Sequence, residues 1–315
     1  MKILGNGYLS ADGRALAQKV VGDNQAGFDA LLRSIEQFRS FAATREVARQ
    51  ESDAEKQRVI ALILAARLLE ISEAAYLVML HGMSTEANSL FRVFLDAYFV
   101  FGNICSSEEF VAEYFNSDEA NRLKLINAAK KHSSELFKPA NEGISEEHRS
   151  NLKDRVEGEK IQTFNSHNYA AKIGCEGIYD SMYRLLSSAV HTSPRALVGY
   201  SEEDASGIVL SARDGPSEGD IPQRLHGFAY FIIKTLSGLQ EVFECLDQAE
   251  IERLTAGLNK CQKSNITISR WRLSTGEVNR PGSLDIRQAL KKPPTDREPV
   301  TRAANLRSWP LNRRR

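Results

Sequence analysis

One segment of the chain would be apolar around most of its circumference as a helix, and it limits the possible folds more than any other segment. It reads VIALILAARLLEISEAAYLVMLHG and spans residues 59–82. Upstream, Ser52 and Glu55 have the S-x-x-E spacing of a helix capping box, and Gly82 stands where a C-terminal cap belongs. A helix that is apolar on several sides has to be covered by other helices. The sequence therefore predicts an all-α fold built around this helix.

Apolar residues recur at helical spacing through most of residues 26–265. The segment 85–104 has an aromatic-rich face, and the segment 225–246 is long and amphipathic. We expect one domain here, a multi-helix bundle of about six to eight helices in which short loops join antiparallel neighbours. At most one short strand pair is expected, at GIVLSA. Residues 1–25 contain four glycines and little periodicity, so we expect a loosely ordered N-terminal lead-in.

Charge is distributed unevenly between the body of the chain and its C-terminal part. The whole chain has 41 basic and 41 acidic side chains, but residues 266–315 hold twelve of the former and four of the latter. This part therefore carries a net charge of +8, against −8 for residues 1–265. It also contains five of the nine prolines and few periodic apolar residues, which predicts a disordered basic tail. Trp271 and Trp309 in this tail could stack on single-stranded nucleic acid, although a solvated tail is the simpler interpretation.

The sequence carries no signal for a metal, a cofactor or a membrane span. Its four cysteines form no C-x-x-C pair, and its histidines lack H-x-x-x-H or H-E-x-x-H spacing, so we expect no metal site. There is no phosphate-binding glycine loop and no nucleophile elbow. No apolar run approaches the roughly 18–20 residues that a membrane helix needs. We therefore expect a cytoplasmic protein that binds no cofactor.

The stretch MYRLLSSAVHTSPRAL, residues 182–197, contains the main candidate for a catalytic site. Arg184 and His191 are seven residues apart, so both leave the same face of a helix, with Ser187 and Ser188 between them. Histidine exchanges protons near pH 7, and arginine can bind a phosphate. These are components of phosphodiester cleavage. The alternative is structural, with the histidine capping the helix and the arginine paired with a carboxylate.

A second polar pair lies in the apolar stretch FRVFLDAYF. Arg92 and Asp96 are four residues apart, on the same side of the predicted helix. Charged groups among large apolar side chains cost free energy unless they are paired. The sequence therefore predicts either an ion-pair network that fixes the register of two helices, or the lining of the pocket that contains His191.

The run RLLEISEAAYLVMLHGMSTEANSLFRVFLDAYFVFGN and the later SSAVH resemble a bacterial helical family of unknown function, domain-of-unknown-function family 5677. Members of the family resemble R-x-L-x-E, G-x-x-x-E-A and R-x-x-x-E/D on consecutive helices, followed by S-x-x-V-H. Here the last three read GMSTEA, RVFLD and SSAVH, whereas the first reads RLLE. The resemblance covers roughly residues 55–200. It implies that Arg92, Asp96 and His191 occupy the recurring polar positions of the family.

More distantly, the chain is similar to HEPN helical domains, many of which are RNases of toxin–antitoxin and phage-defence systems. Their motif is an arginine, four to six residues, and a histidine, which Arg184 and His191 match with six. The residue after the arginine is commonly polar in those domains and is Leu185 here. The resemblance implies an HEPN-like, metal-independent endoribonuclease that acts as a homodimer on RNA, with an unidentified antitoxin or protein partner. The sequence leaves open whether the chain is an enzyme at all or a non-catalytic interaction or sensor module.

Overall fold

The computed structural model describes residues 2–4, 7–44, 52–132, 134–191, 197, 200–203, 209–217, 219–243 and 248–265. The tail predicted for residues 266–315 lies outside this part of the chain. The helices within it are α1 (Ala11–Asp23), α2 (Gln25–Ala43), α3 (Asp53–Leu80), α4 (Ser84–Ser106), α5 (Glu109–Lys131), η1 (Glu135–Phe137), α6 (Lys138–Gly143), α7 (Glu146–Gly158), α8 (Ser166–Lys172), α9 (Glu176–Ile178), the π-helical turn η2 (Tyr179–Tyr183), α10 (Arg184–Val190), α12 (Ile221–Phe243) and α13 (Gln248–Asn265). The strands are β1 (Lys2–Leu4), β2 (Ser201–Glu203) and β3 (Val209–Arg213).

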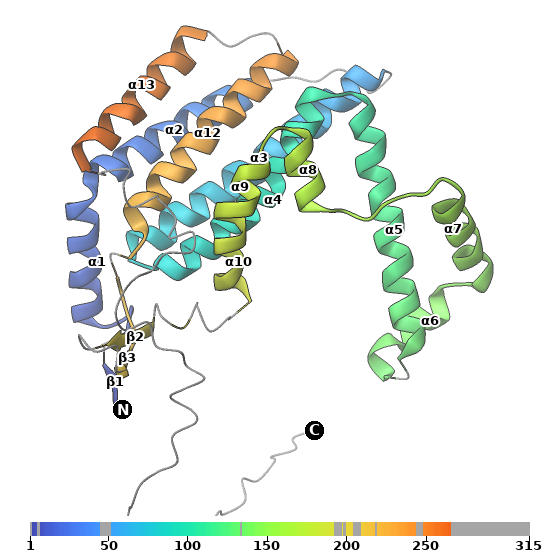
Figure 1. Ribbon diagram of the computed structural model, residues 1–315, viewed down its shortest axis with the longest axis horizontal. Coiled ribbons are helices and arrows are strands. Elements are labelled where there is room, and N and C mark those ends of the chain that lie inside the picture. The colour runs from blue at the N-terminus through green and yellow to red at the C-terminus, as the bar shows by residue number, and fades with distance from the viewer. Residues whose placement is uncertain are drawn as a thin grey trace, which may run out of the picture.

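Helix α3 begins and ends where the sequence predicts. The Ser52 hydroxyl accepts a hydrogen bond from the Glu55 amide at 3.2 Å, and the Glu55 carboxylate accepts one from the Ser52 amide at 3.0 Å. Gly82 follows the helix in the left-handed conformation, with φ of +70°. The short connection lets α3 and α4 pack against each other along their lengths (Figure 1). The predicted capping box and helix pair are confirmed.

The core lies between α2, α3, α4 and α12, which run side by side in Figure 1. The aromatic face predicted for residues 85–104 points into it, because Phe91 and Phe94 are fully buried. The Phe91 ring lies 4.5 Å from that of Phe228 on α12, and the Phe94 ring lies 5.5 Å from it. A continuous apolar core therefore joins segments that are more than a hundred residues apart in the sequence.

Gly227 on α12 lies directly beside this core, and its replacement by alanine should destabilise the fold. A Cβ atom at this position would lie 2.7 Å from two ring carbons of Phe91, which the neighbouring Phe228 prevents from moving aside. Overpacking of this kind costs about 1–3 kcal/mol. Gly257 on α13 is the matched control, because a Cβ atom there meets nothing within 4 Å. In urea unfolding, Gly257→Ala should be neutral or stabilising by about 0.5–1 kcal/mol; equal effects of the two substitutions would contradict this packing.

The predicted all-α fold class is confirmed. The structure differs from the prediction in the N-terminal residues and in the number of helical segments. Residues 1–25 do not form a loosely ordered lead-in, because they contain β1 and α1. The Ser10 side chain caps α1 by accepting from the Gly13 amide at 2.8 Å, and Ala17 and Val20 bury one face of the helix. Glycines interrupt the apolar pattern there and conceal the helix. The described residues also contain more helical segments than expected, because residues 135–190 are divided into short pieces.

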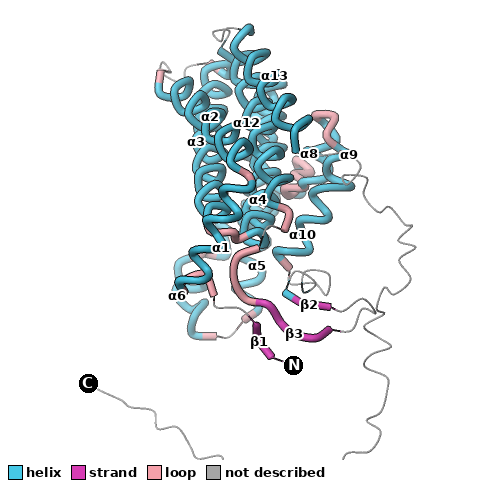
Figure 2. Tube along the Cα trace, turned by 90° about the vertical axis from the view of Figure 1, so that its left-hand side faces the viewer, coloured by secondary structure: helices cyan, strands magenta, loops and turns pink. Residues whose placement is uncertain are grey.

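The described strands form a small sheet in the order β1-β3-β2. Strand β3 contains part of the GIVLSA segment, and it pairs in parallel with β1 and antiparallel with β2. The sheet lies at one end of the bundle, next to the N-terminus (Figures 1 and 2). Helices α5, α6 and α7 extend from the bundle on the other side, and α7 has no buried residue (Figure 1). Within the described part of the chain, no helix is long and apolar enough to cross a membrane.

Candidate functional site

The predicted site residues lie on α4 and on the segment from α8 to α10, which packs along α4 (Figure 1). Its centre is the Asp96 carboxylate on α4. One of its oxygens accepts hydrogen bonds from the Ser166 hydroxyl at 2.6 Å and from the Tyr183 hydroxyl at 2.8 Å. The other oxygen forms an ion pair with Arg92, one turn earlier on α4. Asp96 therefore joins α4 to both α8 and η2.

The guanidinium of Arg92 has three different partners in this cluster. Besides its ion pair with Asp96, its Nε donates to the Ser187 hydroxyl at 3.4 Å, and its central carbon lies 4.2 Å from the centre of the Tyr183 ring. The side chains of Arg92 and Asp96 are only 21% and 24% exposed. Salt bridge, hydrogen bond and cation–π contact together satisfy a charge that is largely withdrawn from water.

Burial also raises the pKa of the Tyr183 phenol, a group that is protonated at neutral pH in any case. Desolvation is the main cause that raises the pKa of Tyr183, and it outweighs the Ser166 hydrogen bond and the charge of Arg92, which both act to lower it. A phenol with a raised pKa remains a hydrogen-bond donor at neutral pH. Tyr183 therefore binds Asp96 as a donor and adds no second negative charge beside it.

A π-helical turn, η2, brings two tyrosines face to face next to this cluster. The rings of Tyr179 and Tyr183 stack at 4.6 Å with an angle of 21° between their planes. Arg92 lies over the Tyr183 ring, and the guanidinium carbon of Arg184 lies 5.7 Å from the centre of the Tyr179 ring. The His167 and Tyr179 rings form an edge-to-face pair, with 5.0 Å between the ring centres. Each of the two arginines thus contacts one ring of the aromatic stack. π-Helical turns are rare and frequently occur at functional sites.

Arg184 and His191 mark the two ends of α10. Arg184 is the first residue of the helix, and its side chain is 65% exposed and 3.0 Å from an Asp180 oxygen. His191 is the C-cap residue and is exposed, and its backbone amide donates to the Ser187 carbonyl. The intervening Ser188 donates to the Leu185 carbonyl of its own helix, at 2.7 Å. The structure therefore brings Arg92, Asp96 and Ser187 together, and it places Arg184 and His191 on the surface next to them.

This region of the chain matches a known protein family. Residues 58–208 match the model of a family of unknown function (DUF5677). This part of the chain is a DUF5677 domain. Searches of curated proteins and of solved structures found no match.

The DUF5677 domain contains every residue of the cluster, from Arg92 to His191. It does not contain α1, α2, α12 or α13, although α2 and α12 cover α3 and α4 and complete the core. The family resemblance predicted for residues 55–200 is confirmed. The more distant HEPN resemblance stays a prediction.

Three members of the cluster, Ser166, Tyr179 and Tyr183, were not predicted from the sequence. Ser166 is 70 positions from Asp96, and spacing rules concern only residues within a few turns of each other. Tyr183 directly precedes Arg184, so the pattern of an aromatic residue next to an arginine was visible. Nothing in it indicated a π-helical turn, because the same residues could continue an α-helix.

One further group of side chains could hold a cation. Ligand atoms of His167, Glu176 and Asp180 all lie within 4.8 Å of one another. Spacing rules for a single helix do not reveal it, because His167 is on α8 and the two carboxylates follow the turn at Gly174. All three side chains are substantially exposed. They already have partners within the protein, since His167 lies close to Glu176 and Asp180 forms an ion pair with Arg184.

Proposed function

We propose that this DUF5677 protein is a metal-independent endoribonuclease whose reactive groups are His191 and Arg184. His191 moves a proton of the ribose 2′-hydroxyl or of the leaving group, and Arg184 binds the scissile phosphate. The observation that carries the proposal is that an imidazole and a guanidinium are both exposed at the two ends of one short helix. The HEPN resemblance supplies the substrate class.

The ion pair of Arg184 with Asp180 does not prevent this role. Both side chains are at least half exposed, and they are four residues apart on one helical segment. Exposed pairs of this kind contribute about 0.3–0.5 kcal/mol and are screened by salt. A phosphate that carries a full negative charge and accepts two hydrogen bonds from a guanidinium competes well with such a carboxylate. Arg184 is therefore available to an RNA substrate.

The largely buried cluster positions the reactive helix. Ser187 lies in the middle of α10, and its hydroxyl accepts from Arg92 on α4 and donates to the Tyr183 carbonyl at 2.9 Å. Asp96 holds Arg92 and Tyr183 in place at the same time. Arg92, Asp96 and Ser187 are thus positioning residues, which fix the orientation of α10 relative to the core.

The biological setting is proposed from the resemblance. HEPN RNases act in bacterial stress and phage defence, and they dimerise so that two arginine–histidine motifs face each other. We propose the same for this chain, with RNA as substrate, a second copy of the chain across the site, and an antitoxin or other protein as regulator.

A second candidate function is a non-catalytic helical interaction or sensor module. It is favoured by one observation, namely that each of the two arginines already has a carboxylate partner, Asp96 for Arg92 and Asp180 for Arg184. In that case the polar residues fix helix positions, and His191 is only a helix cap. The two candidates differ in whether RNA is cut.

Expression in a bacterial host tests the proposal with a matched histidine control. Wild type, His191→Ala and His148→Ala are expressed to equal levels, and growth and the integrity of total RNA are followed. His148 is also exposed, but it lies on α7, away from the cluster. Wild type and His148→Ala should slow growth and fragment RNA, whereas His191→Ala should do neither. Intact RNA with equal growth in all three strains would contradict the proposal.

A further inference from the structure

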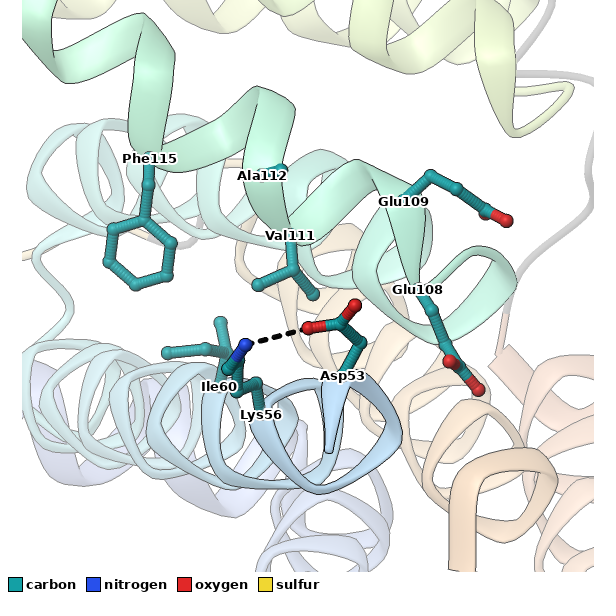
Figure 3. A pocket seen from close by; sticks show the side chains of 8 residues that line it. All are labelled: Asp53, Lys56, Ile60, Glu108, Glu109, Val111, Ala112 and Phe115. Atoms are coloured by element: carbon teal, nitrogen blue, oxygen red, sulfur yellow. Dashed lines mark hydrogen bonds and ion pairs between the residues drawn. The ribbon is translucent and has the colours of Figure 1, made fainter. Parts of the chain in front are cut away.

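A pocket lies between the first turns of α3 and α5, away from the site on α10 (Figure 3). It has a volume of about 360 Å³. Its apolar part consists of Ile60 on α3 and of Val111, Ala112 and Phe115 on α5. Phe115 is 52% exposed, so part of its ring is open to a partner at this pocket. A volume of this size can hold one aromatic side chain.

The other lining side chains of this pocket are charged, and their balance is negative. Asp53, Glu108 and Glu109 contribute carboxylates, whereas Lys56 is the single cation among the described lining residues. Lys56 is already paired with Asp53 at 2.7 Å. Figure 3 shows Phe115 at one end of the pocket and Glu108 and Glu109 at the other. A segment that carries an aromatic side chain next to several positive charges would therefore complement this pocket.

The chain itself contains such a segment near its C-terminus. Residues 301–315, TRAANLRSWPLNRRR, contain Trp309, five arginines and no acidic residue. The opposite net charges of the tail and the body, +8 and −8, favour contact between the two at moderate ionic strength. The segment therefore matches the pocket in both its aromatic residue and its charge.

The length of the connecting chain selects Trp309 over Trp271. Helix α13 ends at Asn265, at the opposite end of the bundle from the first turn of α3 (Figure 1). Helix α3, which spans this direction, has 28 residues and is about 42 Å long. Trp271 is six residues beyond Asn265 and reaches at most about 20 Å, whereas the 44 residues up to Trp309 reach well over 100 Å.

We propose that the segment around Trp309 docks on its own chain in the pocket between α3 and α5. The indole packs on Phe115 and Ile60, and the flanking arginines lie against Glu108 and Glu109. The tail is then a tether that folds back on the DUF5677 domain. This inference does not depend on the proposed nuclease activity, and its test requires no RNA.

Tryptophan fluorescence tests the docking directly, because both tryptophans of the chain are in the tail. In full-length Trp271→Phe protein, Trp309 is the single tryptophan, and it is excited selectively at the red edge of the absorption band, where tyrosine does not absorb. We expect its emission to be blue-shifted and protected from acrylamide quenching, compared with the same protein in urea. Glu108→Lys with Glu109→Lys, or Phe115→Ser alone, should abolish both effects. Leu125→Ser is the matched control, because Leu125 is an exposed apolar residue of α5 outside the pocket, and it should change neither.

Three results would overturn the proposal. A red, fully quenchable Trp309 in the parent protein would show that the segment is not docked. Protection that survives the pocket substitutions would place it on another surface. Protection that disappears on dilution would show that a second copy of the chain supplies the tail. Circular dichroism of each variant establishes that the fold is retained.

Discussion

Replacing Asp96 with alanine is expected to lower the free energy of unfolding by about 2–3 kcal/mol. The substitution removes the ion-pair partner of Arg92 and the acceptor of the Tyr183 and Ser166 hydroxyls. Breaking a fully buried pair costs about 3–5 kcal/mol, because the remaining charge stays buried without a partner. The expected cost is smaller here because Arg92 and Asp96 keep about a fifth to a quarter of their side-chain exposure. Urea unfolding followed by circular dichroism measures it.

Asp180→Ala is the matched control for this prediction. It also removes a carboxylate from an arginine four residues away, but both side chains of that pair are at least half exposed. Its cost should stay within about 0.5 kcal/mol. Equal unfolding midpoints for the two variants would show that the cluster around Asp96 does not hold α4, α8 and η2 together.

The second large effect is expected on catalysis. His191→Ala should lower the rate of RNA cleavage by about 10²–10⁴-fold, which is the usual contribution of a general acid–base group. Stability should not change, because the side chain is exposed and the hydrogen bond to the Ser187 carbonyl that ends the helix is made by the backbone amide. The measurement is the single-turnover rate on a labelled single-stranded RNA, with His148→Ala as the control. A variant that loses cleavage and stability together would indicate a structural role for His191.

Features encoded by neighbouring residues were predictable from the sequence. The capping box of Ser52 and Glu55, the left-handed Gly82 and the pairing of α3 with α4 depend on a few consecutive positions. The proximity of Arg92 to Asp96 has the same origin, because residues four apart on a helix face the same side. Whether this pair is an ion-pair network that fixes helix register or the lining of the pocket that contains His191 stays a prediction. Arg92 does contact Ser187, because α10 packs on α4.

Other features arise only when distant segments meet. The Ser166 hydroxyl reaches Asp96 because α8 packs on α4, and no local pattern encodes that contact. The π-helical turn at Tyr179–Tyr183 adds one residue to a helical turn, and the sequence has no separate signal for it. Helix α1 was not predicted, because its glycines lower the helix propensity and leave only a short apolar face. Burial of Ala17 and Val20 against the bundle stabilises the helix despite this low propensity.

Incubation of purified protein with RNA in the presence of EDTA decides whether this chain is a metal-independent nuclease. We expect the wild type to cut single-stranded RNA, because attack by the ribose 2′-hydroxyl needs no metal when His191 moves the proton and Arg184 binds the phosphate. This attack breaks the bond to the 5′-oxygen and leaves 2′,3′-cyclic phosphate and 5′-hydroxyl ends. Arg184→Ala and His191→Ala should leave the RNA intact. RNA that the wild type does not cut, or that all three proteins cut equally, would refute the proposed activity.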